Sequence, residues 1–322
     1  MNLQGVSQIF GRCLALPKVP GTLCPNSLLC LSLLFALLLV RPTTGINVYY
    51  VAPEGHNDGP GRQNKPWATI QHAAEMMGPG DTLYVRGGSY PEEVEITVSG
   101  EADAPIVYAA YPGETVILDG GDRGRQAAFT IRPGVSHIRL QGFIVRGYNE
   151  AAISVEGGNS DIEIASLSAS GAGSGGVRLT TGLPGQPPDN GPVDHIVIRD
   201  SHIHDNGLNG IACIPGPCHD LLLTNLLIEN NGLAADLKEM PRTLEVHGIV
   251  VERGQRIRIE QAQVFNNGGN GIALNSRDEE SVEGILVSRC LVAGSRMDGL
   301  KLWAGGRVEN SVVHSNEGTP LA

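Results

Sequence analysis

Residues 137–145 read HIRLQGFIV, and six further stretches of the same kind follow. They are DIEIASLSA at 161–169, HIVIRDSHI at 195–203, DLLLTNLLI at 220–228, RIRIEQAQV at 256–264, GILVSRCLV at 284–292 and GGRVENSVV at 305–313. The stretches alternate apolar with polar residues and are rich in β-branched side chains, which is typical of strands with one buried face. Because the stretch returns every few tens of residues, the sequence predicts a solenoid in which each copy contributes one coil.

A second strand is expected in each coil, eight residues after the end of the first. Val145 and Ile153 have this spacing, and the other copies keep it except the fourth, where an insertion separates Ile228 from Ile249. Since side chains alternate faces along a strand, the second strands should supply two inward columns and one outward column between them. The inward columns are Ile153, Val177, Ile211, Ile249, Ile272 and Leu300, then Val155, Leu179, Cys213, Val251, Leu274 and Leu302; the outward column is Ser154, Arg178, Ala212, Val250, Ala273 and Lys301.

The turn after the first strand carries a recurring polar residue: Asn206, Asn231, Asn267, Ser295 and Asn316. In coils stacked about 4.8 Å apart, such side chains can hydrogen-bond one another and the turn backbone, which would otherwise be buried without partners. A ladder of this kind requires parallel strands. Residues 136–322 are therefore predicted to form the regular coils of an all-β parallel β-helix. The last residue falls within a predicted strand, so we expect the final coil to be truncated or capped by a partner.

Residues 46–135 are predicted to form an N-terminal cap and the first, irregular coils. The stretch PWATIQHAAEMM at 66–77 breaks the strand pattern and predicts a short helix, whose apolar face is Ile70, Ala73, Ala74 and Met77. The end coil of a solenoid exposes unpaired strand edges, so we expect this helix to lie across the end as a cap.

The first 45 residues form a separate segment. Residues 28–40, LLCLSLLFALLLV, carry no charge and follow a weakly basic stretch, which is typical of a secretory signal peptide cleaved near Gly45. An uncleaved membrane anchor is the alternative, but this apolar run is shorter than the roughly 20 residues that a spanning helix needs. We therefore expect a secreted or cell-surface protein that meets a membrane only through this segment, if it is uncleaved.

The composition favours a core of stacked aliphatic side chains. The chain has 322 residues, 43 glycines, 4% aromatic residues and a net charge of −11, and this acidity argues against nucleic acid as a partner. We expect a monomer. The sequence offers no GxSxG, Walker or GxGxxG context, so acyl transfer and nucleotide binding have no support.

Three cysteines follow the leader: Cys213, Cys218 and Cys290. Cys213 and Cys290 fall at inward positions, which favours small buried hydrophobic residues. A bridge between Cys213 and Cys218 across the IPGP loop is the alternative in an oxidising compartment, and it is expected to require that Cys213 turn outward.

Three N-terminal stretches, YYVAPEG, PWATIQHAAEMM and GDTLYVRGGSY, are similar to the cap of secreted right-handed parallel β-helix proteins of the pectate-lyase-like superfamily. Farther along, DGLKLWAGG followed by NSVVHSNEG resembles the family-nine polysaccharide lyases. The resemblance covers nearly all of the chain after the leader. It implies a right-handed coil and an extracellular polysaccharide of uronic acids, cleaved by β-elimination.

Family-nine lyases use a lysine base, which lies on a later coil than this chain contains, and a calcium ion. The resemblance implies calcium ligands at Asp298 of the DG motif and in residues 314–320, HSNEGTP, which stand where the family has NSDDGWD. Asn316 and Glu317 thus replace the paired aspartates, and Pro320 replaces the last one. Calcium prefers six to eight oxygen ligands with enough negative charge, so this set predicts weak binding, and continuation of the Asn ladder by Asn316 is the alternative.

Candidate substrate contacts lie at the same end of the chain. Lys301 is predicted to point outward beside Asp298 and Trp303, as the candidate catalytic base or, alternatively, as a solvated strand charge. Trp303 is the strongest candidate for sugar contact, because an exposed indole offers an apolar face to a pyranose ring. Arg307 is a further substrate-binding candidate.

A polar column formed by Asn209, His247, Asn270 and Asp298 comes one residue before the glycine that opens the second strands. It makes His247 and Asn270 candidate substrate contacts, and the alternative is that the column only satisfies turn backbone. We expect, in sum, an extracellular β-helix that binds or processes polysaccharide, either as a calcium-dependent lyase or as a noncatalytic glycan-binding or scaffold module.

Overall fold

The computed structural model of this chain describes residues 46–121, 124–180, 190–234, 246–274, 284–303 and 306–318. The predicted signal peptide or membrane anchor at 1–45, and the part of the final coil at 319–322, lie outside these residues. Among the described helices, none combines the length and the apolar character needed to cross a membrane. Gly45–Ala322 forms one unit by its internal contacts.

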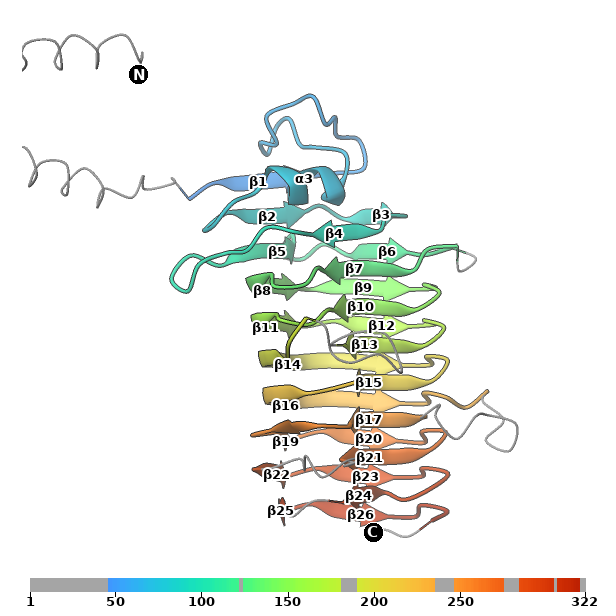
Figure 1. Ribbon diagram of the computed structural model, residues 1–322. Coiled ribbons are helices and arrows are strands. Elements are labelled where there is room, and N and C mark those ends of the chain that lie inside the picture. The colour runs from blue at the N-terminus through green and yellow to red at the C-terminus, as the bar shows by residue number, and fades with distance from the viewer. Residues whose placement is uncertain are drawn as a thin grey trace, which may run out of the picture. The chain divides into compact units, whose positions relative to one another are not determined.

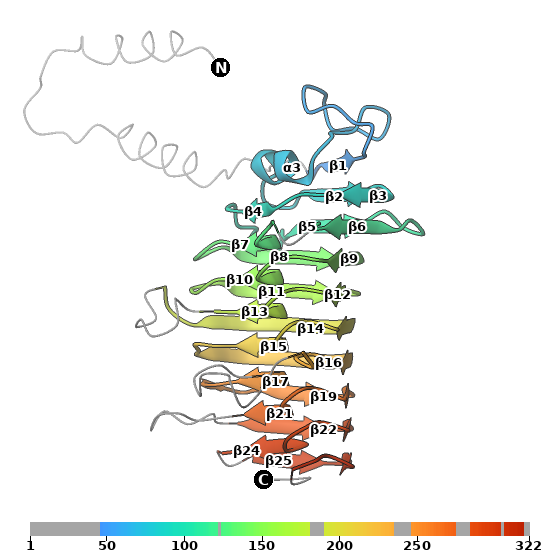
Figure 2. The same ribbon diagram turned by 90° about the vertical axis from the view of Figure 1, so that its right-hand side faces the viewer.

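The strands lie parallel and stack coil upon coil, as the repeat predicts (Figure 1 and Figure 2). One long sheet is made of two stacks joined by a bend. Its first stack is β1 (Val48–Val51), β2 (Thr82–Val85), β5 (Ile106–Ala110), β8 (Ser136–Gln141), β11 (Ser160–Ala165), β14 (Val193–His204), β16 (Cys218–Glu229), β18 (Gly254–Gln255), β19 (Arg258–Glu260), β22 (Ile285–Ser288) and β25 (Gly306–Glu309). Its second stack contains the later halves of β14 and β16 together with β3 (Gly88–Tyr90), β6 (Val116–Asp119), β9 (Phe143–Arg146), β12 (Ser168–Ser170), β20 (Gln263–Phe265), β23 (Leu291–Ala293) and β26 (Val312–His314).

A separate eight-stranded sheet closes the coil on the remaining side. It is made of two strands of the first coils, β4 (Val94–Ile96) and β7 (Ala127–Ile131), and of the predicted second strands, β10 (Ala151–Val155), β13 (Gly175–Leu179), β15 (Asn209–Cys213), β17 (His247–Val251), β21 (Asn270–Leu274) and β24 (Leu300–Leu302). The register matches the repeat, since Ile211 pairs with Val177 on one side and with Ile249 on the other. The two inward columns are buried as predicted, apart from half-buried Leu302. A fully buried aliphatic side chain contributes about 1.5–3 kcal/mol, so these columns supply much of the stability.

Left-handed residues bend the chain at the corners of the coil. His137, Asp161, His195 and Asp220, each the first residue of a predicted run, have φ between 48° and 59°. A second corner within the runs is built in the same way by Ser166, Asp200, Asn225, Gln261, Arg289 and Asn310. Residues with short polar side chains such as Asn and Asp reach this region at low cost, which explains their recurrence.

The predicted ladder is present at the next turn from Asn206 to Asn267, but not at Ser295, whose buried Oγ has no hydrogen-bond partner among the described residues. Asn206 Nδ2 donates to Asn231 Oδ1 at 2.9 Å, and Asn231 Nδ2 donates to Asn267 Oδ1 at 3.0 Å. Each acceptor oxygen also receives a backbone N–H from the coil above it, as in the 3.1 Å bond from Asn231 N–H to Asn267 Oδ1. All three side chains are buried. The ladder therefore satisfies turn backbone that water does not reach.

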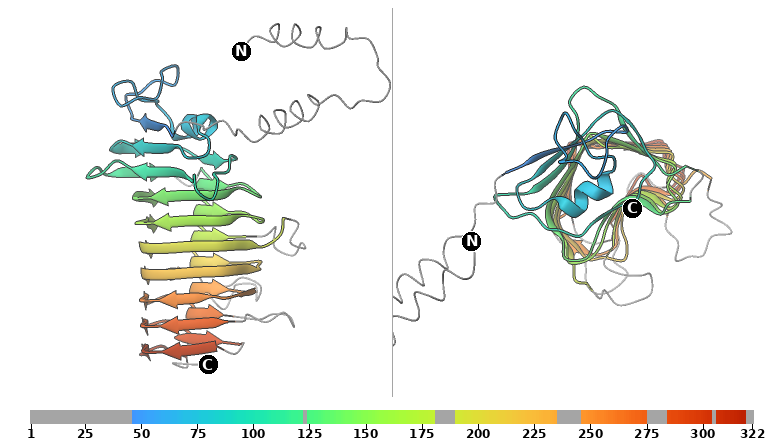
Figure 3. Two further views of the ribbon diagram at one scale, coloured as in Figure 1. Left: turned by 90° about the vertical axis from the view of Figure 1, so that its left-hand side faces the viewer. Right: turned by 90° about the horizontal axis from the view of Figure 1, so that it is seen from above.

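The capping helix is α3 (Ile70–Met76), shorter than the stretch that predicted it. Ile70, Ala73, Ala74 and Met77 are buried as expected. Seen from above in Figure 3, α3 lies across the first coil. Two backbone N–H groups of its first turn donate to the Glu92 carboxylate at 3.1 Å, and burial of this carboxyl raises its pKa.

Two expectations about the eight-stranded sheet need correction. Cys213 and Cys218 form a disulfide, and both are fully buried, so the expectation that the bridge would require Cys213 to turn outward is wrong. The bridge closes within the core because the chain between β15 and β16 returns to the inside at Cys218. The second concerns the outward column: Ala212, Val250 and Ala273 face away from the main core, as the alternation predicts, but they are buried in a small apolar cluster of their own.

Candidate functional site

Lys301 and Trp303 form a cation–aromatic pair on the outside of the last described second strand. Lys301 lies on β24 between inward Leu300 and Leu302, in register with Ala273. Its Nζ atom is 4.7 Å from the ring centroid of Trp303, which is 60% exposed. The Trp303 backbone N–H donates to Leu274 O at 3.1 Å, which fixes the backbone that carries the indole. The structure thus brings together the candidate base and the candidate sugar contact.

The polar column predicted beside the second strands satisfies turn backbone. Asn209 Oδ1 accepts the His247 backbone N–H at 2.7 Å, His247 Nδ1 accepts that of Asn270 at 3.1 Å, and Asn270 Oδ1 accepts that of Asp298 at 3.0 Å. Asn209, His247 and Asn270 are buried. These contacts match the structural alternative, and substrate binding by His247 and Asn270 stays a prediction.

The proposed calcium ligands do not make a set that fits calcium. Asn316 Oδ1 accepts the Ser295 backbone N–H at 3.0 Å, and its Nδ2 donates to His314 O, so the amide continues the ladder of the coils above. Glu317 is exposed, and its backbone N–H is bonded to Ser295 O. Two carboxylates, Asp298 and Glu317, and an amide already in use fall short of the six to eight oxygens that calcium takes.

Arg307 on β25 is exposed and already paired. Its Nε donates to Glu309 Oε2 at 2.8 Å. An incoming carboxylate would have to compete with Glu309 for this guanidinium group. Substrate binding by Arg307 stays a prediction.

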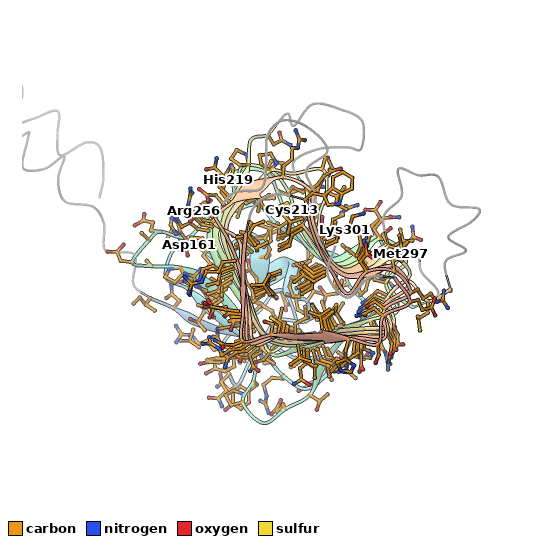
Figure 4. The ribbon with its side chains drawn as sticks, turned by 90° about the horizontal axis from the view of Figure 1, so that it is seen from below. Asp161, Cys213, His219, Arg256, Met297 and Lys301 are labelled. Atoms are coloured by element: carbon orange, nitrogen blue, oxygen red, sulfur yellow. A yellow bond between two sulfur atoms is a disulfide. The ribbon has the colours of Figure 1, made fainter. Side chains whose placement is uncertain are left out.

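A histidine–carboxylate group at one corner was not predicted as a site. Ligand atoms of Asp194, His195 and Asp220 lie within 4.8 Å of one another. The Asp220 carboxylate, however, accepts hydrogen bonds from Arg256 at 2.6 and 2.5 Å, and these bonds lower the pKa of Asp220. Figure 4 shows Arg256 on the far side of the cross-section from Lys301. The guanidinium already neutralises Asp220, one of the two carboxylates of this group, and occupies its oxygens, which disfavours a cation there.

Three half-buried tyrosines near the N-terminal cap were also missed. Tyr50 and Tyr84 are register partners on β1 and β2, and Tyr111 follows β5. A cleft of 430 Å³ lies beside Tyr50, lined also by Val48, Arg62, Gln63 and Asn64. The sequence does contain a tyrosine at an outward position of two successive strands, Tyr50 and Tyr84. Only the pairing of β1 with β2 shows that their rings lie side by side.

Family models and curated proteins match different parts of the chain. A model described as a right-handed β-helix region matches residues 133–317, and a Pel9A-like right-handed β-helix model matches residues 49–206. Pectate lyase PEL9 from Emericella nidulans is 45% identical over 73 residues, which are 22% of this chain and 18% of that protein. The uncharacterized protein YwoF from Bacillus subtilis is 27% identical over 154 residues, which are 48% of this chain and 28% of that protein. The chain thus matches less than a third of either relative.

Solved structures share the architecture. The crystal structure of pectate lyase Pel9A superposes with a TM-score of 0.54 at 16% identity, over 84% of this chain and 80% of that one. The complex of XylC with xylose superposes with a TM-score of 0.53 at 15% identity, over 83% and 70% of the two chains. At these identities the likeness concerns the fold. The stacked parallel coils and a family model that spans more than half of the residues show that this chain belongs to the right-handed β-helix family, Pel9A-like in its N-terminal half and related to polysaccharide lyases.

Proposed function

We propose that this protein binds an acidic extracellular polysaccharide on its outer face at β24. The observation that carries the proposal is the 4.7 Å separation of Lys301 Nζ from the ring centroid of exposed Trp303. The indole offers an apolar face to a pyranose ring, and the ammonium group offers a charge to a sugar carboxylate. The likeness of one segment to pectate lyase PEL9 supports carboxylated sugars as the ligand class.

The surrounding strand makes this pair suited to binding. Buried Leu300 and half-buried Leu302 flank Lys301 and fix its strand to the core. Because the ring face attracts the ammonium group, the two side chains hold each other in place before a ligand arrives. Binding then loses less side-chain entropy than it would with two independent groups.

The test is retention of the protein in gels that contain polygalacturonate. Trp303→Ala and Lys301→Gln are each expected to weaken retention, because the first removes the stacking face and the second the charge. Met297→Ala, which changes another exposed apolar side chain before the same strand, is the matched control and should leave retention unchanged. A chelator should have no effect, since the residues present do not fit calcium. Unaltered retention of Trp303→Ala would reject this face as the binding site.

A second candidate is β-elimination on the same glycan, favoured by the 45% identity to pectate lyase PEL9 over 73 residues. In this reaction Lys301, as the neutral amine, would take the proton from the carbon next to the sugar carboxylate. The bond between the neighbouring carbon and the glycosidic oxygen would break, that oxygen would leave with a proton from water, and the new carbon–carbon double bond of the product would absorb ultraviolet light. Incubation with polygalacturonate or alginate decides between the two candidates. Rising absorbance that is lost in Lys301→Ala supports the lyase, whereas constant absorbance with retained binding leaves the noncatalytic module.

An extracellular location belongs to the same proposal. The Cys213–Cys218 disulfide supports it, because disulfides persist in oxidising compartments and are rare in the cytosol. The apolar run at residues 28–40 supports it as well. N-terminal sequencing of the protein recovered from culture medium is the check, with a start near Gly45 expected.

A further inference from the structure

We propose a second glycan-binding site at the N-terminal end of the β-helix, formed by a tyrosine triad and the loop that carries Arg62. The triad is Tyr50 on β1, Tyr84 on β2 and Tyr111 after β5. The proposal takes its ligand class, an acidic polysaccharide, from the proposed function. Its location and its residues are independent of the Lys301 face, which lies many coils away in Figure 1.

The three rings form one aromatic surface. Tyr50 and Tyr84 have ring centroids 6.0 Å apart, Tyr84 and Tyr111 5.8 Å, and Tyr50 and Tyr111 6.3 Å. Next to them along the strands, Val51 and Val85 point inward and are fully buried. The tyrosines therefore occupy the outward face, and each remains half-buried rather than covered. Clustered phenol rings give apolar faces for sugar rings and hydroxyl groups for their polar edges.

A cleft beside Tyr50 adds the polar groups that a sugar needs. It has a volume of 430 Å³ and is lined by Val48, Tyr50, Arg62, Gln63 and Asn64. The two carboxamides can donate to and accept from hydroxyl groups, and the guanidinium can bind a carboxylate through two hydrogen bonds. Gln63 and Asn64 also line an adjacent cleft of 640 Å³, so the polar surface continues past the first cleft.

Charge favours an acidic ligand in the 430 Å³ cleft, where Arg62 is the charged residue of the lining, whereas Glu54 and Asp58 line the adjacent cleft. Arg62 is exposed and makes no ion pair with any of the described residues. Arg86, by contrast, is committed to Glu114, with Nη2 and Oε1 2.7 Å apart, and its guanidinium carbon lies 4.7 Å from the Tyr111 centroid. That pair fixes the position of Tyr111 and leaves Arg62, among the residues that line the 430 Å³ cleft, as the cation that can take a sugar carboxylate.

The loop that carries Arg62 is held against the first strand. The Tyr50 backbone N–H donates to Gly61 O at 2.7 Å, and Tyr50 O accepts the Trp67 N–H at 2.9 Å. Gly61 has φ 67°, and a Cβ atom there would come within 2.6 Å of the Trp67 indole, so only glycine fits. Trp67 Nε1 in turn donates to Gly59 O. A site on a fixed loop binds without first paying for the ordering of its backbone.

The test measures binding of short galacturonate oligomers by calorimetry in the Trp303→Ala protein, which isolates this end of the molecule. Tyr50→Ala combined with Tyr84→Ala should weaken the remaining binding about tenfold or more, given the usual worth of aromatic contacts. Tyr50→Phe keeps the ring and should retain most of the affinity. Arg62→Gln should weaken binding of galacturonate oligomers but not of galactose oligomers. Thr82→Ala, on the outward face of the same strand as Tyr84, is the matched control and should change nothing.

The outcomes separate this site from the one at β24. Loss of all binding in Trp303→Ala, or residual binding that ignores the tyrosine substitutions, would overturn the triad as a site. Unchanged binding in Trp303→Ala together with loss in the tyrosine variants would reject the β24 face and leave the triad as the glycan site.

Discussion

At the scale of single residues, the asparagines of the ladder are the side chains whose role the sequence predicted best. A polar residue that recurs at one turn of successive coils has one partner above and one below, and the bonds from Asn206 to Asn231 and from Asn231 to Asn267 follow that rule. Asn316 was predicted both as a ladder member and as a calcium ligand. The structure uses its oxygen for the Ser295 backbone, because a turn N–H inside the stack needs an acceptor.

Replacing Asn231 by alanine should lower the free energy of unfolding by about 3 kcal/mol, because it removes the acceptor of the buried Asn206 backbone N–H and of one Asn206 Nδ2 hydrogen, while Nδ2 keeps its bond to Ala169 O. Denaturant unfolding followed by circular dichroism measures the change. Asn149→Ala, at an exposed asparagine whose side-chain amide bonds only Gln126 among the described residues, is the control and should change stability by less than about 0.5 kcal/mol. Equal effects of the two substitutions would contradict the ladder as a stabilising element.

At the scale of elements, strand faces and the capping helix could be predicted because their apolar spacing follows the 2.0- and 3.6-residue periods. Ile70, Ala73, Ala74 and Met77 are buried for this reason. Contacts between elements depend on the length and path of the chain that joins them, and the apolar spacing within an element does not predict these. The contact between Tyr50 and Tyr84 depends on how the 30 residues between β1 and β2, from 52 to 81, fold back. The burial of Ala212 depends on which side chains cover the outer face of its strand.

The disulfide that joins the end of β15 to the start of β16 should stabilise this step of the coil. A cross-link with a sequence separation of 5 removes conformational entropy from the unfolded chain, which raises the free energy of unfolding by about 2 kcal/mol. The double variant Cys213→Ala, Cys218→Ala should lower the free energy of unfolding by about that amount. Reductant should lower the melting temperature of the parent protein but not of the double variant. Labelling of both thiols by an alkylating agent in the denatured, unreduced protein would show that the bridge is absent.

At the scale of the whole molecule, the inward side chains of the β-helix stabilise the fold, and the outward side chains are the ones available for binding. The inner columns and the ladder are set by the repeat, so the β-helix itself could be predicted from the sequence. The outer face carries no such constraint, and the repeat does not tell a binding residue from a solvated one. Lys301 and Trp303 were correctly expected to lie near one another, whereas the Arg62 cleft became visible only with the loop folded against β1.

Tryptophan fluorescence tests the central claim, glycan binding at the β24 face, most directly. The chain has two tryptophans: Trp67 is 3% exposed and Trp303 is 60% exposed, so a neutral soluble quencher such as acrylamide reaches mainly Trp303. Galacturonate oligomers that stack on the indole should protect it, and quenching should fall with oligomer concentration along a saturable curve. Quenching that stays the same at oligomer concentrations where calorimetry shows the protein to be saturated would contradict the account.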